Sequence, residues 1–219
     1  MLVLVPCLAA AAHAPEGDPA DPLPRPGLSA GMGVLYLSAR DVVDLVNASA
    51  VPSERVDQFR AVAEFFGAAS FPVADVWIIK VEYAFLTGSY AVGSFLGEAD
   101  FSLTAHMPSV IVQYVVAERG LYNLKIGAGG GFYAGTLAEK YLTIDQRFSG
   151  TGGGALAELE ANTAFGEHLY AFLGVNLRWS FIGELTGPTG IPPGRGSGGG
   201  GTTLAFFAAG ARIGFSYYF

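Results

Sequence analysis

Residues 168–182 of the chain read HLYAFLGVNLRWSFI, and this stretch decides the fold class. Apolar side chains occupy every odd position from Leu169 to Phe181, whereas the even positions mix small, aromatic and polar residues, among them Asn176 and Arg178. A helix repeats every 3.6 residues and cannot sort side chains in this way, but a β-strand sends alternate side chains to opposite faces. The stretch therefore predicts a long strand with one apolar face.

The end of the chain repeats this alternation. Ile213, Phe215, Tyr217 and Phe219 share one face of the last strand, and Arg212 lies on the other. Strands that cross a bilayer need about 9 to 11 residues, which is longer than the usual globular strand of five or six. Eight segments of this kind are predicted, at approximately 29–39, 74–88, 98–107, 109–118, 121–136, 152–165, 168–182 and 202–219.

The composition favours a membrane barrel. The chain is 51% hydrophobic and only 14% charged, with a mean hydropathy of +0.41, whereas an ordinary soluble domain has about 25% charged residues. No run reaches the roughly 18 apolar residues that a membrane-spanning helix requires. A closed sheet satisfies its backbone hydrogen bonds in lipid without outside partners. The sequence thus predicts an all-β, antiparallel, up-and-down transmembrane β-barrel of eight strands.

The first 28 residues are expected to lie outside the barrel, first as a cleaved signal peptide and then as a disordered segment. Residues 1–14 predict a signal peptide, with an apolar segment followed by an Ala-x-Ala-like cleavage site at Ala12-His13-Ala14. Residues 15–28, rich in proline, aspartate and glycine, predict a disordered lead-in, and 29–219 is assigned to the barrel. Cys7, the only cysteine, falls in the signal peptide. A lipidated Cys7 is the alternative, which the preceding Pro6 disfavours.

The connections alternate in length, as in outer-membrane barrels. Long ones are predicted near 40–73, 137–151 and 183–201, and short ones near 118–120 and 166–167. The first long loop contains a predicted amphipathic helix at 53–66, with Ser53 as N-cap and Gly67 as a stop signal. This helix could cap the barrel mouth or pack on its rim.

The polar side chains of the strands predict a neutral interior network. A charge facing lipid near the midplane costs about 2 to 4 kcal/mol, so charged side chains in mid-strand are expected to point inward. Four basic residues balance four acidic ones, and an eight-stranded barrel is just wide enough to be filled by side chains. A plugged interior is therefore favoured over an ion-selective pore, which would need an excess of one sign. The predicted interior residues are Lys80, Glu82, Asp100, His106, Gln113, Lys125, Glu158, Glu160, Asn176, Arg178 and Arg212.

Signals for catalysis, cofactors or metals are weak. His106 shares its predicted face with Ser102 and Thr104, and His168 follows Glu167, so a serine–histidine–acid site can be imagined. The spacing gives it no support, so no catalytic residues are expected. Three scattered histidines do not predict a metal site, and no cofactor is expected. The net charge of −7 argues against a nucleic-acid partner.

The alternating strands, the signal segment and the terminal Ile213, Phe215, Tyr217 and Phe219 resemble the OmpA/OmpX/OmpW-like small outer-membrane barrels. The resemblance is one of pattern and covers about 190 residues. It implies a Gram-negative outer membrane as the location, with outer-membrane lipid and the barrel-assembly machinery as partners of a monomer. The machinery would recognise the terminal strand as an assembly signal.

Three functions remain open at this stage. The first is a structural or surface-interaction role with a side-chain-filled interior. The second is porin-like passage of small hydrophobic solutes through a gated, narrow barrel, with the first-loop helix as a lid. The third is a lipid-modifying enzyme.

Overall fold

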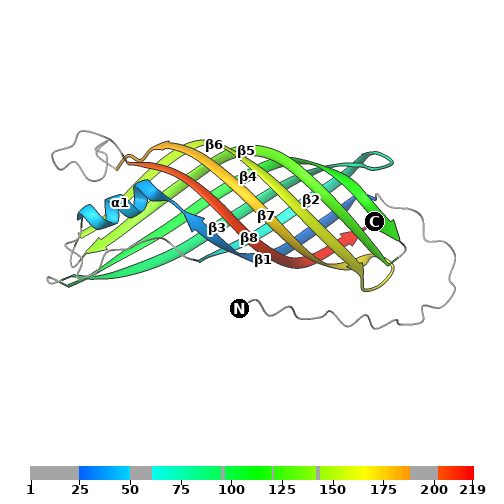
Figure 1. The fold of residues 1–219 in the computed structure, drawn as a ribbon, viewed down its shortest axis with the longest axis horizontal. Helices are drawn as coiled ribbons and strands as arrows, with labels where there is room; N and C mark the ends of the chain where they lie inside the picture. The colour runs from blue at the N-terminus through cyan, green and yellow to red at the C-terminus, as the bar shows by residue number, and fades with distance from the viewer. Residues whose placement is uncertain (1–24, 50–60, 95–96, 120, 142–143, 188–201) are drawn as a thin grey trace, which may run out of the picture.

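The computed structural model describes residues 25–49, 61–94, 97–119, 121–141, 144–187 and 202–219. Eight strands form a closed barrel in which each strand pairs antiparallel with its neighbours along the chain, and β1 closes the ring against β8 (Figure 1). This confirms the predicted fold class. The elements are β1 Gly27–Ser38, α1 Arg40–Ser49, β2 Val62–Ala74, β3 Trp77–Ser94, β4 Gly97–Arg119, β5 Tyr122–Tyr141, β6 Ile144–Ala164, β7 Leu169–Glu184 and β8 Thr203–Tyr218. Residues 1–24, which include the predicted signal peptide, lie outside the described part.

The two ends of the barrel differ. At one end, called the terminal end, β1 begins beside the end of β8, and the short connections after β2, β4 and β6 are found there. At the other end, called the helix end, α1 follows β1 (Figure 1). Long connections at the helix end follow β1 and β7, whereas only two residues separate β3 from β4 and β5 from β6. The prediction of a long loop near 137–151 is therefore wrong, because most of this segment belongs to the paired ends of β5 and β6.

The segment 62–74 corrects the sequence prediction. It is strand β2, whereas the predicted structure there was a loop with a helix at 53–66. Residues 50–60 lie outside the described part, but Val62, Glu64 and Phe66 are buried on one face of β2 with Phe65 exposed between them. A short apolar run does not distinguish strand from helix by itself, and closure of the barrel requires a partner for the free edge of β1. The observed helix is α1, at 40–49.

Strand β4 corrects a second prediction. Segments 98–107 and 109–118, predicted as two strands, are one strand of 23 residues. Pro108 lies on the outer wall, and the register of β4 with β3 and with β5 is the same on both sides of it. Proline removes one donor from the ladder but does not turn the chain here. The prediction lacked β2 but counted β4 twice. Because these two errors offset each other, the predicted number of eight strands agrees with the structure.

The barrel interior has two levels. Toward the helix end it is an apolar core, and α1 covers it with the buried side chains of Val42 and Val43. Toward the middle and the terminal end it holds the buried charged and amide side chains, together with apolar ones such as Ile78, Ile111 and Val115. The apolar core includes Leu35, Leu37, Leu86, Phe101, Leu103, Met107, Tyr133, Leu137, Phe148, Ile182, Leu204 and Phe206.

The outer wall carries a continuous apolar band. Every strand contributes exposed large hydrophobic side chains, including Met32, Phe65, Val81, Val112, Ile126, Leu159, Val175 and Ile213. Aromatic pairs occur toward both limits of the band, with Trp77 against Tyr114 near the terminal end and Trp179 against Phe207 nearer the helix end. Such a surface is far larger than the apolar patches of soluble monomers, and an apolar band edged by aromatic residues is the outer face of a transmembrane barrel.

No helix among the described residues is long and apolar enough to cross a membrane.

Gly154 makes room for a buried ring. A Cβ atom at this inward position would lie 1.9 Å from the ring of Tyr133, whereas a Cβ on the outward Gly153 would have its nearest neighbour at 3.9 Å. We expect Gly154→Ala to lower the free energy of unfolding by about 1–3 kcal/mol, because it overpacks a filled interior. Gly153→Ala should change it by less than about 0.5 kcal/mol. Urea unfolding of the barrel in lipid vesicles measures both, and equal losses would contradict the inward placement of Gly154.

Candidate functional site

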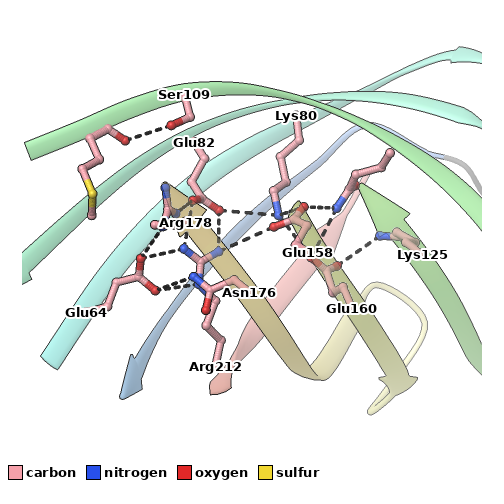
Figure 2. Close-up of polar contacts among 12 residues, drawn as sticks. Glu64, Lys80, Glu82, Ser109, Lys125, Glu158, Glu160, Asn176, Arg178 and Arg212 are labelled. Atoms are coloured by element: carbon pink, nitrogen blue, oxygen red, sulfur yellow. Dashed lines mark hydrogen bonds and ion pairs between the residues drawn. The ribbon is translucent and has the colours of Figure 1, made fainter. Parts of the chain in front are cut away.

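Eight charged side chains meet inside the barrel and form its most distinctive polar site. They come from six strands, and each residue is at most 7% exposed. Figure 2 shows them pointing toward one another across the interior. We call this set the charge network. Its members are Glu64 of β2, Lys80 and Glu82 of β3, Lys125 of β5, Glu158 and Glu160 of β6, Arg178 of β7, and Arg212 of β8.

Two arginines and two glutamates form one half of the charge network. Glu64 accepts hydrogen bonds from Nε of Arg178 at 3.0 Å and from Nε and Nη2 of Arg212 at 2.7 and 2.8 Å. Glu82 accepts bonds from Nη2 of Arg178 and Nη1 of Arg212, the latter at 2.9 Å. Paired bonds of this kind hold a guanidinium and a carboxylate in one orientation. The Arg212 guanidinium also lies over the ring of Phe66, 4.5 Å from its centroid.

Two lysines and two glutamates form the other half. Nζ of Lys80 lies 2.7 Å from Glu158 and 3.3 Å from Glu160. Lys125 reaches Glu160 at 3.4 Å and donates a 2.6 Å hydrogen bond to the hydroxyl of Tyr218. Lys80 is also 3.5 Å from Glu82, which joins the two halves into one network.

Neutral amides surround the carboxylates. Nε2 of Gln113 donates to Glu158 at 2.7 Å, and Nδ2 of Asn162 donates to Glu160 at 2.9 Å. Nδ2 of Asn176 donates to Glu64 at 3.3 Å. Buried charges are costly unless they are paired and hydrogen-bonded, and the eight charges here satisfy one another and sum to zero.

The arrangement braces the barrel. Lys80 of β3 contacts Glu158 of β6, and Glu64 of β2 contacts Arg178 of β7, although neither pair of strands is adjacent. An eight-stranded barrel leaves only enough space for side chains, and these pairs reach across that space. The chemistry of the site is therefore electrostatic cross-linking of opposite walls.

The structure brings nine of the eleven predicted interior residues together inside the barrel. All nine are buried, and each of them contacts another of the nine or, in the case of Asn176, Glu64. They are Lys80, Glu82, Gln113, Lys125, Glu158, Glu160, Asn176, Arg178 and Arg212.

The predictions for Asp100 and His106 are wrong, since both are exposed on the outer wall, as is Ser102. Because β4 is one continuous strand, residues 100–106 keep the parity set by the inward Gln113, and Phe101 and Leu103 fill the interior instead. A shift of one residue moves every side chain of a strand to the opposite face. The inward preference of charged residues applies only inside the apolar band, and Asp100 lies beyond it toward the helix end.

Glu64 is the one charged member of the network that was not predicted, because it lies within the segment 53–66 for which a helix was expected. The balance of the predicted interior charges does indicate that a further acidic residue is needed. Without Asp100, the four predicted interior cations face only three carboxylates, Glu82, Glu158 and Glu160, so a neutral interior requires one more acid. Glu64 supplies it and receives bonds from two arginines.

The two histidines of the described region do not form one site. His106 is on the outer wall, with Nδ1 2.6 Å from the hydroxyl of Tyr83 and its ring beside Phe85. His168 lies at the terminal end, with Nδ1 2.9 Å from the backbone oxygen of Tyr218. Within the described ranges, no group of three or more histidine, cysteine, aspartate or glutamate residues is placed to hold a metal ion.

Comparisons with known proteins identify the fold. No family model and no curated protein sequence matches the chain. Among solved structures, Neisserial surface protein A superimposes with a TM-score of 0.56 at 11% identity, covering 89% of this chain and 97% of that one. Ail, the attachment invasion locus protein of Yersinia pestis, gives 0.54 at 9% identity, covering 90% and 100%. The chain has the fold of the small, OmpA/OmpX-like outer-membrane barrels, which confirms the predicted resemblance at the level of the fold.

Proposed function

We propose that this chain is an integral barrel of the bacterial outer membrane, that its interior is closed to solutes, and that it has a structural or surface-interaction role. The observation that carries the proposal is the filled interior. A solute entering from the terminal end would meet the charge network and then the apolar core, where Leu35, Phe101 and Leu137 are fully buried.

Neither barrier has the properties of a conducting path. Ion selectivity calls for rings of one charge or for aligned carbonyl groups, whereas the charge network is neutral and its members are bonded to each other. The described apolar core consists of aliphatic and aromatic side chains, and the hydroxyl of Tyr133 within it accepts a hydrogen bond from Arg178. Val42 and Val43 of α1 cover this core. Of the helix predicted as a lid for gated passage, residues 62–66 belong to β2, and residues 53–60 lie outside the described part.

The outer wall at the helix end supports a role at the cell surface. Strands β3 to β6 are 18 to 23 residues long, whereas the other four are 12 to 16. Their additional length has polar residues on the outside and buries Phe101, Leu137 and Phe148 on the inside, so it projects beyond the apolar band as a wall. We call the exposed residues of this wall the polar collar. They are Ser89, Asp100, Ser102, Lys140, Asp145, Arg147 and Ser149.

The terminal strand supports the proposed route into the membrane. Ile213, Phe215, Tyr217 and Phe219 are all exposed on the outer face of β8 and its end. An outward aromatic row at the end of the chain is available both to lipid and to the barrel-assembly machinery, and we propose it as the assembly signal of a monomeric barrel.

Surface labelling tests this orientation. Lys140→Cys in the polar collar and Asp75→Cys in the β2–β3 turn place single thiols at opposite ends of the barrel, both at exposed positions. In intact cells, a membrane-impermeant maleimide should label Lys140→Cys and spare Asp75→Cys, and lysed cells should show both labelled. The parent chain, whose one cysteine is Cys7, is the control. Recovery of the chain in detergent-free buffer, or the reverse labelling pattern, would contradict the proposal.

A further inference from the structure

A groove of about 540 Å³ lies on the outer wall at the helix end, where the start of α1 meets β7 and β8. Its wall is formed by the outward side chains of Trp179, Phe181 and Phe207. Its rim is formed by Arg40 and Asp41, the first two residues of α1. The groove is thus aromatic on the side of the apolar band and charged on the side of the helix.

The charges of the rim are not equivalent. The Asp41 carboxylate accepts a hydrogen bond from the hydroxyl of Thr203, at the beginning of β8, and so is engaged with the barrel. Arg40 is exposed at the groove. A guanidinium presents a planar set of donors that matches phosphate oxygens in a bidentate way. The rim therefore favours an anionic group of this shape.

The wall of the groove continues into the apolar band. Trp179 and Phe207 pack with their ring centroids 5.5 Å apart, and both side chains are more than one-third exposed on the lipid-facing surface. Tryptophan is enriched where hydrocarbon meets the polar headgroups. The molecule that reaches this groove from the membrane is consequently a lipid, with its chain against the aromatic pair and its headgroup near the helix.

We infer that this groove is a binding site for an outer-leaflet lipid whose phosphate headgroup has a net negative charge, in which Arg40 binds the phosphate and the Trp179–Phe207 pair contacts an acyl chain. The inference rests on the proposed membrane location and adds a ligand class to it. In this proposal α1 has two roles. It covers the apolar core, and its first turn supplies the phosphate contact.

The tryptophans allow a direct test. The chain has only two, Trp77 and Trp179, and only Trp179 lines this groove. Trp77→Phe leaves Trp179 as the sole reporter, and Trp179→Phe leaves Trp77 as a matched reporter on another part of the band. Each variant is reconstituted in phosphatidylcholine vesicles that contain increasing fractions of phosphatidic acid or phosphatidylcholine, with brominated acyl chains that quench tryptophan fluorescence on contact.

Brominated phosphatidic acid should quench Trp179 at about fivefold lower mole fraction than brominated phosphatidylcholine, the preference expected from one arginine near an anionic lipid. Trp77 should show no preference. Arg40→Gln should abolish the preference of Trp179, and Arg147→Gln, which removes an exposed arginine of the polar collar, should preserve it.

Three results would overturn the inference. The first is equal quenching of Trp179 by the two brominated lipids, and the second is a preference that survives Arg40→Gln. The third is loss of the preference on adding millimolar inorganic phosphate, which would show that the site binds free anions. If neither tryptophan is quenched by either lipid, the barrel is not in the bilayer, and that result removes the proposed membrane location together with the site.

Discussion

Replacing Glu64 with glutamine should lower the free energy of unfolding by about 3–5 kcal/mol, the usual loss when one partner of a buried ion pair is removed. The substitution keeps the size of the side chain but leaves Arg178 with the carboxylate of Glu82 alone, and Arg212 with Glu82 and the more distant Glu158 at 3.6 Å. One uncompensated positive charge then remains in the interior. Urea unfolding of the folded barrel in vesicles, followed on unheated gels, measures the loss.

Asp100→Asn is the matched control for this prediction. Asp100 carries the same charge but lies exposed in the polar collar, so its loss should change stability by less than about 0.5 kcal/mol. In the double variant Glu64→Gln with Arg178→Gln, neutrality returns, and the combined loss should be smaller than the sum of the two single losses. A Glu64→Gln barrel as stable as the parent would contradict the charge network as described.

Leu103→Lys should prevent the barrel from reaching its folded form. Leu103 is fully buried in the apolar core, and a lysine there would bring a charge among aliphatic and aromatic side chains. The expected loss is at least several kcal/mol, a large fraction of the stability of a typical domain. The readout is the fraction of protein that migrates as the folded species on an unheated gel.

Ser102→Lys tests the opposite face of the same strand at the neighbouring position. Ser102 is exposed in the polar collar, where a lysine remains in water and should be tolerated. Folding of Leu103→Lys together with failure of Ser102→Lys would show that the inside and outside of β4 are reversed.

The sequence was most informative where a strand lies entirely inside the apolar band. In β7 and β8 the alternation of lipid-facing and interior side chains fixed both faces, and Arg178 and Arg212 lie where the pattern placed them. Lys80 and Lys125 were placed correctly for the same reason. At these positions a charge in contact with lipid is costly, so the chemistry of the side chain determines its direction.

The pattern failed where the surroundings change along a strand. Toward the helix end the outside of β4 is polar and the inside is apolar, so the rule that places charges inward gives the wrong face for Asp100 and His106. The predicted break between 98–107 and 109–118 contributed to the error, because β4 in fact continues past Pro108. The position at which a strand leaves the apolar band depends on its neighbours in the barrel, which a single segment of sequence does not reveal.

The conductance of the inserted barrel tests the central claim most directly. Purified protein, shown to be folded by its anomalous migration on an unheated gel, is added to planar lipid bilayers, with a water-filled porin as the positive control. The charge network and the apolar core together predict no current steps above those of the protein-free bilayer at any applied voltage. Reproducible single-channel steps from the folded protein would contradict a barrel that its own side chains fill.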